Sequence, residues 1–265
     1  MNTELEANRM IHLHRLAIIA KREQWRLEEL DWSRIDFQPL PHTIQHNLAT
    51  IFAHLLCGEQ AALQCVQRLH SFVHHPIQKQ LCEFQITDEK RHCAFFSQLM
   101  SQLVPPAAIR TSMSRLMHDI YSTQRLECLL VGMHIVIESL AQSLFQAAST
   151  IIQKISDNSP IIASIKYIVL EWIPKLLAAD ESRHIAFGHI LISSHLPSLN
   201  MQERENVEKT ITRWGHIIHD MACDPILLYQ MGMMDMTVST RCIKDVNLRL
   251  RQLDLNVQIP LPAAI

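Results

Sequence analysis

The string Asp88-Glu89-Lys90-Arg91-His92 is repeated almost unchanged as Asp180-Glu181-Ser182-Arg183-His184. In each copy a glutamate and a histidine stand three positions apart. On an α-helix such a pair lies on one face, about 4.5 Å apart along the axis, so both side chains can reach one metal ion. A single Glu-x-x-His also occurs on solvated helix faces, but two copies with the same Asp and Arg predict two helices that contribute to a metal site.

Each copy is preceded by a further acidic residue inside an apolar run. Glu59 lies in AHLLCGEQAALQCV and Glu138 lies in VGMHIVIESLAQSLF. A carboxylate on an apolar helix face is costly unless it is paired or binds a metal. The gaps from Glu59 to Glu89 and from Glu138 to Glu181 each leave room for half a helix, a turn and half of the next helix. We therefore expect two helical hairpins, each carrying half of one site.

This pattern resembles the ferritin-like superfamily, particularly its oxygen-activating di-iron branch. In that fold one Glu from each of two helices joins a Glu-x-x-His from each of the other two, all directed inward. The string at 88–92 is similar to a motif of soluble acyl-carrier-protein desaturases, and residues 180–188 are similar to the last ligand helix of many di-iron oxygenases. The resemblance covers about residues 43–195 and implies these metal ligands: Glu59, Glu89, His92, Glu138, Glu181 and His184.

The aspartates of the repeated string have an implied role as partners of the histidines. By resemblance to the ribonucleotide reductase small subunit and the desaturases, Asp180 would hold the free ring nitrogen of His92. Asp88 would hold that of His184 in the same way. A carboxylate in this position fixes the tautomer of a metal-bound imidazole and raises its basicity. The alternative for both aspartates is a helix-surface or capping role.

Three further residues stand close to these ligands in the sequence. Arg91 and Arg183 are expected to pair with the aspartates or with inward carboxylates. His134 lies four residues before Glu138, on the same helix face. It is either a seventh ligand or a hydrogen-bonded histidine beside the site, and we expect the second. A further histidine, His54, lies five residues before Glu59.

The donor set indicates which metals the site would take. Four carboxylates and two imidazoles suit Fe(II) or Mn(II) better than zinc, whose structural sites favour closed tetrahedral coordination with thiolates. Four carboxylates also balance the charge of two divalent ions and leave room for O2. We expect two iron ions, with a mixed Mn/Fe pair as the alternative.

Three positions bear on the type of di-iron chemistry. Phe96 stands where ribonucleotide reductase small subunits have their radical tyrosine, which disfavours a radical-storing subunit. Leu177 stands where the p-aminobenzoate N-oxygenase family has a third histidine, which disfavours N-oxygenation. Trp32, in the N-terminal segment, could carry electrons to the site, but packing over the bundle is the more common role of such a residue.

The favoured function is an oxidoreductase, an oxygenase, hydroxylase or desaturase that activates O2 and acts on a small hydrophobic substrate. A ferritin-like iron oxidase or storage protein and a ribonucleotide reductase-like radical protein are the alternatives; a helical interaction module without catalysis is disfavoured by the complete ligand set. The expected partners are the substrate, O2 and an electron-donor protein. A homodimer is compatible with the sequence.

Composition limits the possible fold classes and indicates the cellular compartment. The chain has 265 residues, 48% of them hydrophobic, only five glycines and a net charge of −2, which disfavours β-sandwiches, phosphate loops and general nucleic-acid binding. Seven cysteines without a Cys-x-x-Cys indicate thiols in a reducing cytoplasm. No apolar run is long enough to span a membrane, and MNTELEANRM lacks the apolar stretch of a signal peptide.

The pattern of apolar positions and prolines predicts an all-α protein and one domain over residues 1–265. Its core would be a ferritin-like four-helix bundle with accessory N- and C-terminal helices. We expect an N-terminal helix over 4–30, two C-terminal helices over 200–252, and core helices at 43–74, 77–103, 111–155 and 161–195. Pro174 should kink the last core helix or mark its restart.

Overall fold

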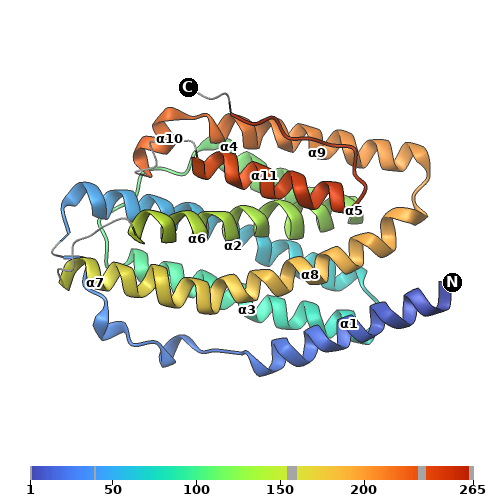
Figure 1. Ribbon diagram of the computed structural model, residues 1–265, viewed down its shortest axis with the longest axis horizontal. Helices are drawn as coiled ribbons and strands as arrows, with labels where there is room; N and C mark the ends of the chain where they lie inside the picture. The colour runs from blue at the N-terminus through green and yellow to red at the C-terminus, as the bar shows by residue number, and fades with distance from the viewer. Residues whose placement is uncertain (1, 39, 154–159, 232–236, 263–265) are drawn as a thin grey trace.

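Four long helical rods form the centre of the molecule (Figure 1). The computed structural model describes residues 2–38, 40–153, 160–231 and 237–262, and all regular elements in these ranges are helical. The first two rods are α2 (His42–Phe72) and α3 (Pro76–Met100). The third joins α5 (Leu126–Leu130), η3 (Val131–Ile137) and α6 (Glu138–Gln153), and the fourth joins α7 (Pro160–Lys166), η4 (Tyr167–Leu177) and α8 (Ala178–His195). The all-α prediction is confirmed.

Local sequence signals explain most of the rod ends. Pro41 precedes α2, and Pro76 begins α3, where its fixed φ suits the first helical turn. The prediction of one helix over 111–155 is wrong, because α4 (Thr111–Ser122) ends before α5 begins. Arg68 of α2 donates to the backbone carbonyls of Tyr121 and Thr123, so a tertiary contact supports that break. The connection between the helices predicted over 111–155 and 161–195 lies largely outside the described residues.

The third and fourth rods each contain a π-helical segment. The segment η3 ends immediately before Glu138, and η4 ends shortly before Glu181. Pro174 was expected to kink or interrupt the fourth rod, and it lies inside η4. The wider turns of this π-helical segment accommodate the proline, which has no N–H to donate within the helix. A π-helical turn changes the direction in which the following side chains point. Both segments therefore influence how the next glutamate is presented.

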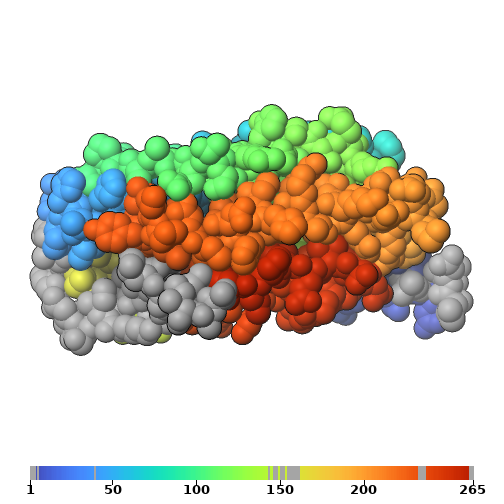
Figure 2. Space-filling model, turned by 90° about the horizontal axis from the view of Figure 1, so that it is seen from above, coloured from blue at the N-terminus to red at the C-terminus, as the bar shows by residue number. Residues whose placement is uncertain are grey.

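Accessory helices cover two opposite sides of the rods (Figure 1). On one side, α1 (Asn2–Arg22) packs on α3 and α8, and the chain continues through η1 (Leu27–Glu29) and η2 (Trp32–Arg34). On the other lie α9 (Met201–Ala222), α10 (Pro225–Gln230) and α11 (Thr237–Gln252), so three helices are described where two were expected. Figure 2 shows α9 between α4 and α11 on this face. None of the described helices has the length and apolar character needed to cross a membrane.

The buried apolar residues form two large clusters with a polar layer between them. Along α3, Cys82 belongs to one cluster and Phe95 to the other, and Glu89 and His92 lie between. Each of the other three rods likewise has one residue of each cluster on either side of its polar positions. These residues are Leu55 and Ala61 on α2, Ile137 and Ala141 around the start of α6, and Leu177 and Phe187 on the fourth rod. The fold thus places selected polar residues in the middle of the core.

Candidate metal centre

Six acidic and histidine side chains from all four rods meet in the polar layer. Each is at most 3% exposed to solvent: Glu59, Glu89, His92, Glu138, Glu181 and His184. Two overlapping groups of three place one ligand atom per residue within 4.8 Å of one another: Glu59, Glu89 and His92, and Glu89, Glu138 and His184. Because Glu89 belongs to both groups, the arrangement suits two ions that share a carboxylate.

Glu181 also lies between the two histidines. Its Oε1 is 3.3 Å from Nδ1 of His92, and its Oε2 is 3.4 Å from Nδ1 of His184. Glu59 Oε2 lies 3.1 Å from His92 Nδ1, and Glu138 Oε1 lies 3.6 Å from His184 Nδ1. Glu89 and Glu181 are thus placed to bridge two ions, with one terminal glutamate and one histidine on each side.

The aspartates of the repeated string bind the outer nitrogen of each histidine. His92 Nε2 donates to Asp180 Oδ2 and His184 Nε2 donates to Asp88 Oδ2, each at 3.1 Å, which are the pairings that the resemblance implied. Each aspartate therefore binds the histidine of the other hairpin. Burial alone would raise the pKa of Asp180, but the hydrogen bond from His92 and the nearby positive charges hold it well below its ordinary value. Both imidazoles direct Nδ1 toward the glutamates.

The repeated arginines pair with the aspartates, and Arg183 also lies 3.3 Å from a carboxylate oxygen of Glu23. Arg91 pairs with Asp88 of its own helix and lies 3.3 Å from Asp180. Arg183 pairs with Asp180 and lies 3.4 Å from Asp88. The two arginines thus hold both aspartates beside the histidines whose hydrogen bonds these aspartates accept.

The segment that follows α1 supplies contacts that the sequence analysis missed. Trp25 Nε1 donates to Asp180 Oδ2 at 2.9 Å, and its ring stacks on that of His92 with centroids 6.3 Å apart. Gln24 Nε2 donates to Asp88 Oδ1 at 3.1 Å. Trp32 instead donates to the carbonyl of Leu27 and packs among aromatic rings of the bundle. Trp25 is therefore the tryptophan in contact with the site.

Gln85 is a second residue that sequence reasoning missed. It lies one helical turn before Glu89, and its Nε2 donates to Glu89 Oε1 at 3.1 Å and to Glu138 Oε1 at 2.9 Å. Its Oε1 accepts from His134 Nε2 at 3.2 Å. Burial, followed by the neighbouring His184, lowers the pKa of His134 to about 3, so this ring is neutral. The spacing of four residues before a ligand was the available signal for Gln85.

The protonation of the metal-free cluster is set by burial and by its own charges. Burial is the main cause that raises the pKa of Glu89 and Glu138 well above the ordinary value. Burial alone would lower the pKa of His92 and His184, but the surrounding carboxylates raise it well above its usual range. Glu181 lies between the imidazoles, and its pKa is held well below normal even though burial opposes this. In the metal-free chain protons are thus held by the same side chains that a metal cation would bind.

Several polar atoms of the cluster are buried without an aligned hydrogen bond, although some of them lie within 3.4 Å of one another. They are Oε1 of Glu59, Oε2 of Glu89, both carboxylate oxygens of Glu181 and Nδ1 of His184. Buried polar groups are almost always paired, and an unpaired set in one place calls for an unseen ion or water. Carboxylate oxygens and imidazole nitrogens are suitable ligands for divalent iron or manganese. The residues present therefore fit a pair of such ions.

No protein-family model matches this chain, and no curated protein matches its sequence.

Proposed function

We propose that this protein is a non-haem di-iron oxidoreductase that activates O2, built on a ferritin-like arrangement of its four rods. The observation that carries the proposal is the set of unpaired buried atoms that face one another in the polar layer, while both outer histidine nitrogens are held by aspartates. One Glu comes from α2, one from the start of α6, and a Glu-x-x-His from each of α3 and α8. This is the inward-facing ligand pattern of di-iron carboxylate bundles.

The donor types support iron, with Mn/Fe as the alternative pair. All donor atoms that face the centre are carboxylate oxygens or imidazole nitrogens. Two divalent ions would be neutralised by the four glutamates, which reduces the cost of burying so many charges. Bound as Fe(II), such a pair would supply electrons and open coordination positions for O2.

The protein residues would orient the ligands, retain protons and exclude water. Asp88 and Asp180 fix both histidines with Nδ1 toward the centre, and the amide of Gln85 holds two of the carboxylates. On one side the layer borders an apolar cluster that includes Phe96 and Leu177, both fully buried. A small hydrophobic substrate would suit this side, and an electron-donor protein would be required to return the centre to its reduced form.

A metal-loading experiment tests the centre itself. The purified chain should bind two Fe(II) ions under anaerobic conditions, measured by elemental analysis after removal of excess metal. Glu89→Ala should lose both ions because Glu89 is placed to bridge them. Glu83→Ala, on the exposed part of the same helix, is the matched control and should still bind two. Two ions in Glu89→Ala, or none in the unchanged chain, would contradict the ligand assignment.

A turnover experiment tests the oxidoreductase function separately. The Fe(II)-loaded chain is exposed to O2 with a chemical reductant and a panel of small aromatic, aliphatic and acyl substrates, and products are identified by mass spectrometry. Incorporation of 18O or loss of two hydrogens from one substrate class would support the proposal. Iron oxidation that proceeds once, unaffected by any substrate, together with a large multi-subunit assembly in gel filtration, would favour iron storage instead.

A further inference from the structure

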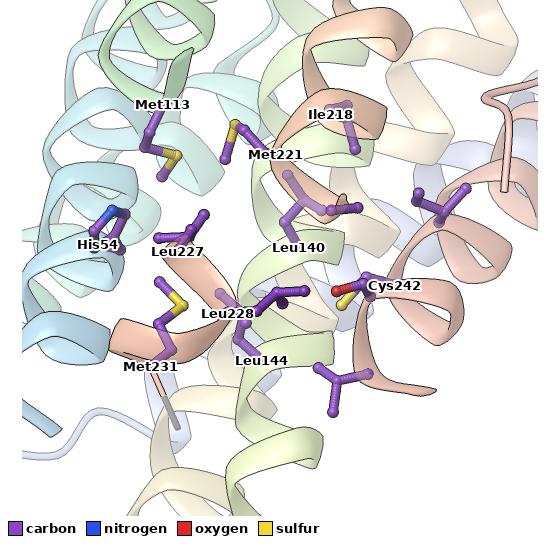
Figure 3. Close-up of a pocket in the computed structure, with 14 residues that line it drawn as sticks. His54, Met113, Leu140, Leu144, Ile218, Met221, Leu227, Leu228, Met231 and Cys242 are labelled. Atoms are coloured by element: carbon purple, nitrogen blue, oxygen red, sulfur yellow. The ribbon is translucent and has the colours of Figure 1, made fainter. Parts of the chain in front are cut away.

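A cavity that is partly open to solvent lies between α2, α6 and the C-terminal helices (Figure 3). It has a volume of about 100 Å³ and is lined by side chains of α2, α4, α6, α9, α10 and α11. On α6, Leu140 and Leu144 face this cavity, whereas Ala141 and Phe145 belong to the apolar cluster beside the metal centre. The cavity is therefore separated from that centre by helix α6.

The walls of this cavity are almost entirely apolar and include adaptable side chains. Met113 of α4, Met221 of α9 and Met231 after α10 all contribute to the lining. Methionine side chains are unbranched and polarizable, so they can rearrange around ligands of different outline. Apolar cavities of roughly 150 Å³ in other proteins bind a single benzene ring. With movement of the methionines, this cavity suits a single-ring or short-chain molecule.

His54 is a polar exception in the wall, and one of its nitrogens has no partner. The side chain is 2% exposed, and Nδ1 donates to the carbonyl of Thr50 at 2.8 Å. Because a carbonyl only accepts, Nδ1 carries the ring proton and Nε2 is left as an acceptor. No described residue donates to Nε2. Burial lowers the pKa of His54, and nearby Arg110 acts in the same direction, so the ring is neutral and Nε2 keeps its lone pair.

We propose that this cavity is a binding site for a small apolar molecule that carries one hydroxyl or N–H donor, as a phenol does. The apolar walls would surround the ring or chain, and, with the same movement of the methionines, the donor would reach the buried Nε2 of His54. Sites for small ligands commonly combine a mainly apolar lining with a few polar atoms that fix orientation. The site uses none of the six residues of the metal centre, and its occupation does not depend on the proposed oxidoreductase function.

Methyl NMR of the full chain labelled at its methionine methyl groups tests the site directly. Phenol and toluene are titrated in turn, because they have nearly the same shape and differ in the donor. Both should shift the signals of Met113, Met221 and Met231 saturably. Ala222→Phe, which fills the cavity from the end of α9, should abolish both responses. Ala108→Phe, at an exposed alanine, is the control and should bind both as before. Unchanged binding in Ala222→Phe would overturn the site.

The role of His54 is tested by the same ligand pair. Its change to Phe should reduce the preference for phenol over toluene about three- to tenfold, the range expected for one hydrogen bond. If His54→Phe does not fold, the 15N resonance of His54 Nε2 in the unchanged chain provides the test. Phenol should move it upfield, as accepting a hydrogen bond does, and toluene should not. No saturable methionine shift, or an equal nitrogen response to both ligands, would refute the proposal.

Discussion

Gly188 is predicted to be the position where one added methyl group damages this structure most clearly. A Cβ built there would lie 2.6 Å from His134 Nδ1 and closer still to its Cβ and Cγ. Because Cβ of His134 is among the atoms contacted, rotation of the ring cannot relieve the clash, and η3 itself must move. Overpacking of a closed core costs about 1–3 kcal/mol, and a forced backbone shift lies at the upper end. An alanine in a helix is also favoured over a glycine by about 0.5–1 kcal/mol, so for Gly188→Ala we expect a melting temperature about 4–10 °C lower.

The same displacement should also affect the candidate metal centre. His134 holds Gln85, which donates to two of the glutamates, and Glu138 follows η3 directly. Gly188→Ala should therefore weaken iron binding as well as lower the melting temperature, measured by calorimetry and by competition with a chelating dye.

Gly58→Ala is the matched control for Gly188→Ala. Gly58 is also buried in a helix next to a predicted ligand, but its nearest neighbour would be Ile137 Cγ2 at 3.9 Å, an ordinary contact. Replacing a glycine in a helix by alanine stabilises it by about 0.5–1 kcal/mol. Gly58→Ala should thus melt at or above the temperature of the unchanged chain. If Gly188→Ala melts within about 2 °C of it, the close approach of α8 and η3 is not as described.

Three further perturbations test other parts of the structure. Trp25→Phe removes a donor from Asp180, which should cost about 1–3 kcal/mol and weaken metal binding about tenfold in chelator competition without changing the stoichiometry; unchanged affinity would refute the contact. In the metal-free chain the pKa of His92 and His184 is raised above the ordinary value of 6.5, so protonation of these histidines stabilises the fold at pH values below 6.5. This stabilisation is lost as the pH rises through the pKa of the folded state. The melting temperature of the metal-free chain should therefore fall above neutral pH, whereas the melting temperature of the metal-loaded chain should not. Asp224→Ala removes the acceptor for the first N–H groups of α10 and the partner of Arg110; a loss of about 1–2 kcal/mol in denaturant unfolding is expected, and no loss would contradict the cap.

The main rods could be predicted because their signals are local. Prolines border α2 and α3, and the periodic apolar pattern between them fixes which face is buried. The two π-helical segments could not be predicted. In η3, for example, the residues are almost all apolar, and such a stretch is equally compatible with an ordinary α-helix. The break between α4 and α5 was missed for a different reason. It is supported by Arg68, whose partners lie more than 50 residues away along the chain.

Within the candidate site, the residues that could be predicted are those that belong to the repeated string. The Asp, Glu and His of the two copies lie within one helix turn of each other on the inward face, so their spacing alone brings them to the centre. Trp25 lies in an irregular segment after α1, without a period or a motif, and only the packing of that segment on α3 and α8 brings it to Asp180. Gln85 had the spacing but not the repetition, since the equivalent position before Glu181 is Leu177.

That last difference makes the two halves of the centre unequal. The hairpins are related by an approximate two-fold pattern in which each aspartate holds the histidine of the other half. At the position one turn before the bridging glutamate, however, α3 has the amide of Gln85 and the other half has the fully buried side chain of Leu177. An ion beside Glu138 would therefore have a hydrogen-bonded polar wall, and an ion beside Glu59 would border the aromatic cluster. Because a neutral molecule such as O2 or a hydrophobic substrate loses least by entering an apolar space, the proposed oxidoreductase function would place its reaction on the Leu177 side.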